Sequence, residues 1–124
     1  MIEIKNNPKN GSGFDLVHNY EGWKVAFITC AEQYGELKVL KRHVKTDETF
    51  VLIEGNATLY TADDDQPLTA THLQKGKLYV VKKNTWHHLK VSDDGLLFVV
   101  ENSNTNKDNT ESKILTDEIK EQIK

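Results

Sequence analysis

The sequence has a single cysteine among its 124 residues, which excludes an internal disulfide bond. Cys30 ends the apolar run at residues 25–30, where a free cysteine behaves as a small buried hydrophobic residue rather than a nucleophile. A lone thiol suits a reducing compartment. The first ten residues also lack the apolar stretch of a secretory signal. We therefore expect a cytoplasmic protein.

Long hydrophobic runs and an excess of one charge are missing as well. No apolar run approaches about 20 residues, so we expect no transmembrane helix and no membrane partner. The net charge is only −3, with acids and bases interspersed, which argues against nucleic-acid binding. With 37% hydrophobic residues the chain can bury a modest core, and we expect one domain over residues 1–124.

Short β-rich segments separated by turn residues make up most of the chain. They predict strands at residues 1–5, 23–30, 37–43, 48–53, 57–61, 68–72, 77–82, 86–91 and 96–100. No strand–helix–strand unit and no long repeat is present, which favours an all-β sandwich or barrel. We place the barrel core at about residues 22–101. A polar, irregular tail over residues 102–124 ends in a short helix capped by Thr116.

Two predicted strands are joined by a turn, and the apolar face of each strand has ionisable residues at the end next to that turn. Successive strand residues face opposite sides, so Lys41 and His43 continue the apolar face begun by Val39. The second strand of this predicted hairpin begins with Glu48 on its apolar face, and His87 lies on the apolar face of residues 86–91. Such groups either cap the core with satisfied polar contacts or build a site. Only a closed or folded-over sheet brings the two regions together.

The spacing of these residues resembles the two motifs of the cupin family. The first motif, G-x5-H-x-H-x4-E-x6-G, corresponds here to Gly35-x5-Lys41-x-His43-x4-Glu48-x6-Gly55. The second, G-x5-P-x-G-x2-H-x3-N, corresponds to Gly76-x5-Lys82-x-Asn84-x2-His87-x3-Val91. The likeness covers under half the chain and is closest to small, single-domain, RmlC-like bacterial cupins without an assigned activity.

The resemblance implies a double-stranded β-helix, which is a jelly-roll barrel, with a short C-terminal helix. It also implies that His43, Glu48 and His87 lie at the barrel mouth in the positions of three cupin metal ligands. Two imidazoles and a carboxylate suit Mn(II), Fe(II), Ni(II) or Zn(II). Together with Lys41, these residues form the candidate ligand-binding site.

Lys41 departs from the family pattern because it replaces the first histidine. A protonated lysine cannot ligate a metal ion and repels one. Its side chain could point away, lose its proton, hold an anionic substrate or pair with Glu48, and the last arrangement would leave a poor metal site. Lys82 and Asn84 replace the proline and glycine of the second motif, so the turn before His87 is expected to differ in detail.

Two classes of function follow. The first is an enzyme or ligand-processing protein that acts on a small polar, anionic molecule. With a metal, Lys41 would orient the substrate, and without one, His43 or His87 would act as a general base while Lys41 stabilises an oxyanion. The second is a non-catalytic binding or sensing domain with a degenerate metal site. The sequence leaves both open and assigns no catalytic residue.

Several other residues carry expectations of their own. Small cupins usually pair, and Trp86, Tyr60 and Tyr79 on the exterior strand faces lead us to expect a homodimer. His88 alternates with His87 and is expected to be a surface side chain. The acidic residues 63–65 lack the spacing of a calcium loop and are expected to form a solvated loop tip.

Overall fold

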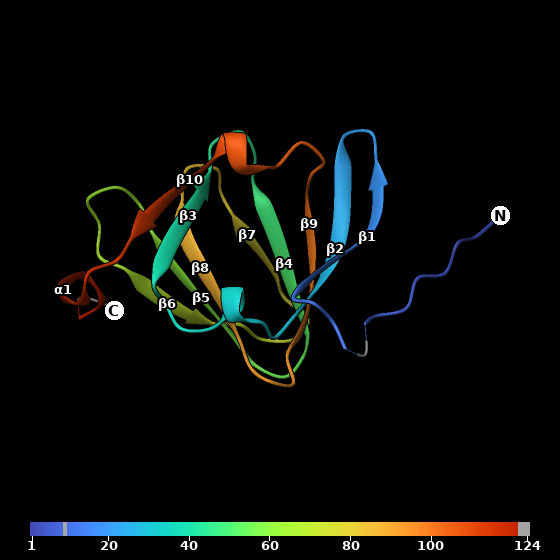
Figure 1. The fold of residues 1–124 in the computed structure, drawn as a ribbon, viewed down its shortest axis with the longest axis horizontal. Helices are drawn as coiled ribbons and strands as arrows, with labels where there is room; N and C mark the ends of the chain where they lie inside the picture. Colours follow the sequence, from blue (N-terminus) through green and yellow to red (C-terminus); the bar gives the residue numbers. More distant parts are fainter. Residues whose placement is uncertain (9, 122–124) are drawn as a thin grey trace.

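The computed structural model describes residues 1–8 and 10–121. Within these residues, ten strands form two five-stranded antiparallel sheets that face each other (Figure 1). The strand order is β1-β2-β9-β4-β7 in the first sheet and β10-β3-β8-β5-β6 in the second. The strands are β1 Phe14–Tyr20, β2 Trp23–Thr29, β3 Val39–His43, β4 Glu48–Glu54, β5 Ala57–Ala62, β6 Thr69–His72, β7 Leu78–Val81, β8 Trp86–Val91, β9 Leu96–Asn102 and β10 Thr110–Ile114. Two 3₁₀ turns, η1 Glu32–Tyr34 and η2 Lys107–Asn109, and a short helix, α1 Asp117–Lys120, complete the fold.

The core lies between the two sheets. Alternate residues of each strand point inward, and the apolar ones pack into one cluster that includes Ile28, Phe50, Leu59, Leu89, Leu97 and Val99. Burial of these side chains provides the main stabilisation of such a sandwich. His43, Glu48 and His87 also point inward, and they lie at one end of this core, beyond the last apolar side chains.

The consecutive strands β3 and β4, which carry His43 and Glu48, belong to different sheets. β3 lies in the second sheet and β4 in the first, so the predicted hairpin of residues 37–53 is wrong and the chain crosses between sheets at residues 44–47. The turn at residues 54–56 also changes sheet. Gly55 has a φ of +73°, and an added Cβ there would lie 2.7 Å from the Cα of Gly95. Alternation along a strand predicts the strand but does not say which neighbour it pairs with.

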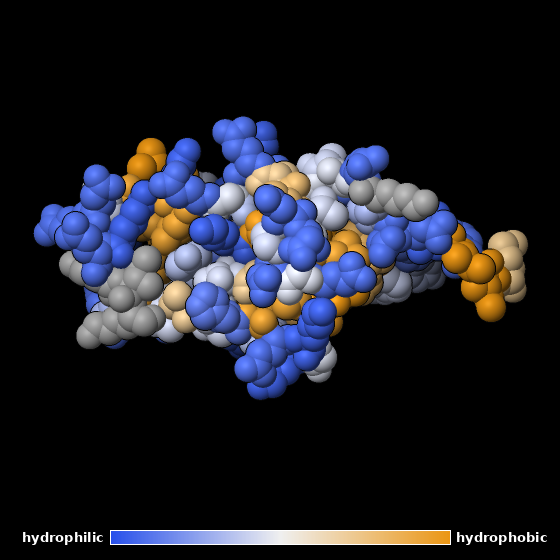
Figure 2. Space-filling view, turned by 90° about the horizontal axis from the view of Figure 1, so that it is seen from below, coloured by the Kyte–Doolittle hydropathy of each residue, from blue (hydrophilic) through white to orange (hydrophobic). Residues whose placement is uncertain are grey.

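The predicted strand at residues 1–5 is wrong. Residues 1–8 form no strand, and Met1, Ile2 and Ile4 are exposed, because the segment runs away from the barrel and meets no sheet edge (Figure 1). In Figure 2 this segment extends to the right, and its tip is apolar. The edge strands β1 and β10 fall outside the predicted core of residues 22–101. Residues 102–112, which we expected to be irregular, contain η2 and the start of β10.

The tail closes over the outer face of the second sheet. β10 pairs with β3, and Leu115 and Ile119 then pack against Leu40 and Trp86. The Thr116 hydroxyl caps α1 by accepting a hydrogen bond from the Ile119 amide, as the sequence predicted, while residues 122–124 of the predicted helix lie outside the described residues. No helix in the described part of the chain is long and apolar enough to cross a membrane.

Candidate metal and ligand site

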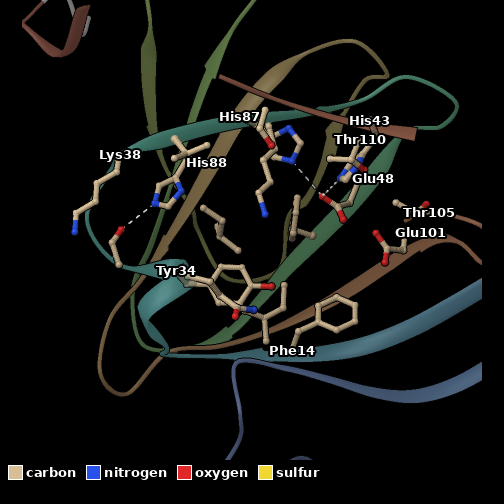
Figure 3. A pocket seen from close by; sticks show the side chains of 18 of the residues that line it. Phe14, Tyr34, Lys38, His43, Glu48, His87, His88, Glu101, Thr105 and Thr110 are labelled. Carbon is tan, nitrogen blue, oxygen red and sulfur yellow. Dashed lines mark hydrogen bonds and ion pairs between the residues drawn. The ribbon is translucent and has the colours of Figure 1, made fainter. Parts of the chain in front are cut away.

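Two imidazoles and a carboxylate meet at the buried end of the barrel mouth. Glu48 Oε1 lies 3.4 Å from His43 Nε2 and 3.4 Å from His87 Nε2. One ligand atom from each of the three residues can be chosen so that all lie within 4.8 Å of one another. Glu48 and His87 are buried and His43 is nearly so. Figure 3 shows the two rings pointing toward the same carboxylate oxygen.

The turn before His87 is fastened to the strand that carries His43. The Asn84 amide donates a hydrogen bond of 2.8 Å to the His43 carbonyl, and the Lys83 amide donates one of 2.8 Å to Asp47. Asn84 has a φ of +68°, in the left-handed region that glycine occupies most easily and asparagine tolerates. The replacement of the motif glycine by asparagine therefore keeps the turn conformation that brings His87 beside His43.

The second nitrogen of each imidazole is held by its own hydrogen bond. His87 Nδ1 lies 3.0 Å from the Thr85 carbonyl, which can only accept, so this nitrogen carries a proton. His43 Nδ1 bonds to the Thr110 hydroxyl at 2.9 Å. Nε2 of His87 therefore faces Glu48, where it donates a hydrogen bond to the carboxylate when it carries a proton and offers its lone pair to a metal ion when it does not.

These residues fit a divalent transition metal. Two histidines and a carboxylate with open positions form a facial ligand set, and a carbonyl partner on the outer ring nitrogen is the usual support of a ligating histidine. Burial alone would raise the pKa of Glu48, yet hydrogen bonds with His43, His87 and Glu101 bring it well below its ordinary value. The carboxyl is therefore ionised, as a metal ligand must be.

Glu101 is a second buried carboxyl at the mouth, which the sequence analysis missed. It continues the inward row of Leu97 and Val99 in β9 and stands opposite Glu48 in the neighbouring strand β4. Burial raises the pKa of Glu101 to about 8, and the hydrogen bond and charge of Glu48 add to the effect, while Lys24 opposes it. Lys24 Nζ lies 3.6 Å from Glu101 and donates a 3.0 Å hydrogen bond to the Thr105 carbonyl. The same inward phase that pointed to Glu48 could have found Glu101.

Lys41 lines the mouth without contacting the carboxylate. It is the cross-strand neighbour of His87, so the two side chains leave the sheet on the same face, as expected from strand phase. Among the described residues, no ion pair joins Lys41 to Glu48, and the lysine is exposed. The arrangement in which Lys41 neutralises the anionic ligand is therefore not the one in this structure.

The three residues lie in a pocket of about 980 Å³, which is large enough for a small organic molecule. Tyr34 of η1 lines it, and Figure 3 shows its hydroxyl directed into the pocket. Burial raises the pKa of Tyr34 to about 12; the charges of Glu48 and Glu101 contribute, and a hydrogen bond with Gln33 opposes them. Residues 31–36 lie between two predicted strands, and no pattern in the sequence indicates this side chain.

His88 is not the free surface side chain that the sequence suggested. It is half-buried, and its Nε2 lies 2.8 Å from the Gly35 carbonyl, which ties the segment after η1 to β8 (Figure 3). Burial lowers the pKa of His88, and this hydrogen bond opposes the shift. His88 thus holds the wall of the pocket that carries Tyr34.

Comparison with solved structures finds cupin proteins. A cupin-2 domain protein of Shewanella frigidimarina is 24% identical, with a TM-score of 0.56 over 75% of this chain and 83% of its own. An RmlC-like cupin of Methanocaldococcus jannaschii with a double-stranded β-helix fold is 20% identical, with a TM-score of 0.57 over 82% and 92%. A variant of Streptomyces Pac13 with uridine is 16% identical, with a TM-score of 0.62 over 97% and 98%, and Pac13 is a nucleoside dehydratase.

No family model and no curated protein matches the chain. The fold is nevertheless that of the cupins, an all-β jelly roll with a short C-terminal helix, which confirms the prediction made from the motif spacing. The structural neighbours are RmlC-like cupin proteins, as the resemblance implied.

Proposed function

We propose that the protein binds a small anionic molecule at the barrel mouth and holds a divalent metal ion there with His43, Glu48 and His87. The main support is the convergence of two imidazoles and one ionised carboxylate within 4.8 Å at the buried end of a pocket. A bound metal would supply a Lewis acid at this position. Thr110 and the Thr85 carbonyl would fix the orientation of the two rings.

The rim of the pocket favours an anion on one side. Lys38 lines it from the segment before β3, Lys41 from β3 and Lys107 from η2, and all three are exposed. Among the described residues, none of these lysines takes part in an ion pair. Glu32 and Glu36 line the η1 side instead, so the attractive side is the one formed by β3 and η2. Uridine, the ligand of a similarly folded protein, is a further probe of this pocket.

Isothermal titration with Ni(II) and Mn(II) tests the metal site. We expect wild type to bind one equivalent. Glu48→Gln should lower the affinity by more than about 100-fold, because even residues that only support a ligand contribute 10- to 100-fold. Glu111→Gln is the matched control, since Glu111 pairs with Arg42 at 2.8 Å outside the pocket and its loss should leave the affinity unchanged. Absence of binding by wild type would contradict the metal proposal.

Two substitutions of Lys41 separate charge from ligation. Lys41→Met removes the ammonium and should raise metal affinity moderately, because a cation near a divalent ion opposes its binding. Lys41→His adds the family's missing imidazole and should raise the affinity further. Equal, tight binding by wild type and both variants would show that Lys41 never opposed the metal.

A further inference from the structure

The pocket has an apolar wall as well as a polar end. Phe14, Ile28, Phe50 and Leu89, from β1, β2, β4 and β8, line the same space as Glu48 and His87. Ile28, Phe50 and Leu89 belong to the main core and are only 1–4% exposed, so the accessible apolar surface of this wall comes from Phe14 and the ring of Tyr34, which are half-buried and pack against that core. A ligand that is polar throughout would leave this wall in contact with water, whereas one with an apolar body would cover it.

Tyr34 presents a hydrogen-bond donor between this wall and the polar end. Its ring packs against the core beside Phe14, and its hydroxyl points into the pocket toward the side that carries Glu48 and Glu101 (Figure 3). The phenol keeps its proton throughout the neutral range, so it can always donate. The hydrogen bond with Gln33 lowers the pKa of Tyr34, which is the effect of a bond that Gln33 donates, and no bond donated by the Tyr34 hydroxyl is found in the described part of the chain. An acceptor atom of a ligand can therefore take that proton.

We propose that the ligand is an amphiphilic carboxylate, whose apolar body packs on the apolar wall at Phe14 and the Tyr34 ring and whose carboxylate accepts a hydrogen bond from the Tyr34 hydroxyl. This inference rests on the proposed function, because it names the class of anion that the same pocket takes. The lysines on the β3 and η2 side of the rim favour entry of such an anion.

Three small probes separate the two halves of the proposal. 3-Phenylpropionate carries both a carboxylate and an apolar body, propionate lacks the body, and 3-phenylpropan-1-ol lacks the charge. Titration followed by NMR should show 3-phenylpropionate binding at least about tenfold more tightly than propionate, because the phenyl ring covers apolar surface. It should also bind more tightly than the alcohol. We expect the same order in metal-free protein and with Ni(II) present, since wall and hydroxyl exist in both.

The variant Tyr34→Phe removes the hydroxyl and keeps the ring in the core. It should weaken 3-phenylpropionate binding about tenfold or more, since a hydrogen bond to a charged acceptor is among the stronger ones, and should change binding of the alcohol far less. Tyr20→Phe, at an exposed tyrosine of β1 outside the pocket, is the matched control and should change neither. An unchanged thermal midpoint for Tyr34→Phe shows that the fold is intact.

The outcomes separate the proposed ligand class from the proposed binding of an anion at the barrel mouth. If propionate binds as tightly as 3-phenylpropionate, or if Tyr34→Phe binds the acid as wild type does, the amphiphilic ligand class is wrong while anion binding stands. If wild type binds neither acid, both the ligand class and anion binding at this mouth are wrong. Tighter binding of 3-phenylpropionate that depends on the Tyr34 hydroxyl supports the inference.

Discussion

Glu101 couples the charge of the mouth to pH. Burial and the facing Glu48 raise its pKa to about 8, above the value of about 4.3 that a glutamate has in an unfolded chain. Between these two values the folded state therefore holds a proton that the unfolded state has lost. The stability contributed by that proton is complete below the unfolded pKa and is lost as the pH rises through about 8.

Glu101→Gln should remove this dependence. In metal-free protein, the free energy of unfolding of wild type should fall relative to that of Glu101→Gln as the pH is raised from about 5 to about 8. Urea unfolding at a series of pH values in the presence of a chelator measures the difference. Glu54→Gln, at an exposed position of β4, is the control and should track wild type. A difference between wild type and Glu101→Gln that stays constant over this range would contradict the prediction.

The turn between β7 and β8 shows how one element positions the site. Asn84 combines a left-handed backbone conformation with an amide that donates to the His43 carbonyl. Because the amide is backbone, a substitution at Asn84 changes the cost of the conformation and leaves the hydrogen bond available. The turn therefore depends on which side chains tolerate positive φ.

Asn84→Val should destabilise the protein by about 1–3 kcal/mol, because a β-branched residue is strained at positive φ. Asn84→Gly should leave stability nearly unchanged, since glycine adopts this conformation freely. Chemical unfolding of the two variants and wild type gives the comparison. Equal stability of the valine and glycine variants would mean that this turn does not hold its conformation in solution.

The strands buried on one face were predictable, as were the edge strands β6 and β7, but the edge strands β1 and β10 were not. Residues 48–53, 57–61 and 86–91 alternate because one side of each meets the core, and all three are strands. β1 and β10 lie at sheet edges and are mostly exposed, so they carry no clear alternation. Residues 1–5 alternate between apolar and polar side chains yet pair with no other strand. Such an alternation describes the side chains and does not show that a neighbouring strand is present.

The site could be predicted as far as the motif spacing reaches. His43, Glu48 and His87 come together because fixed offsets place them at the ends of inward rows. The contact between Lys24 and Glu101 and the placement of Tyr34 depend on which strands and turns are neighbours in space. That information lies in the packing of the two sheets, which no local pattern contains.

At the scale of the whole molecule, the three aromatic residues from which a dimer contact was expected pack within the chain. Trp86 is only 8% exposed because Leu115 and Ile119 pack with it, and its Nε1 donates to Asp64 at 2.9 Å. The acidic loop is thus partly engaged, and Tyr60 packs in the same cluster. Tyr79 packs against the main core. These three aromatic residues therefore give no reason for a dimer.

The outer face of the first sheet carries apolar side chains that are open to solvent. Cross-strand registers align Phe27, Phe98, Val51 and Leu78 in one row across four strands, and Val100 and Val80 lie in the next. Leu78 is 62% and Val80 47% exposed. Thr49 interrupts the second row between Val100 and Val80, but an apolar face of this extent usually marks an interface. We propose that the protein forms a homodimer through this face.

Light scattering after size exclusion tests the dimer. Wild type should have twice the chain mass of 14.2 kDa at micromolar concentration. The double variant Leu78→Lys, Val80→Lys should shift it to a single chain, because charges on the exposed side of β7 oppose association. Ile114→Lys, at an exposed apolar residue of the other sheet, should stay dimeric. A monomeric wild type at high concentration would contradict this proposal.

The crossing of the chain between sheets at residues 44–47 has a consequence for folding kinetics. His43 belongs to a strand whose partners are β8 and β10, and Glu48 to one whose partners are β7 and β9. Four residues of chain therefore join two distant sets of pairings. Such non-local pairing makes folding slow, on the order of milliseconds to seconds. A half-assembled chain with only one sheet lacks part of the ligand set. A metal ion added during refolding would therefore bind only after the barrel has formed and would not raise the folding rate.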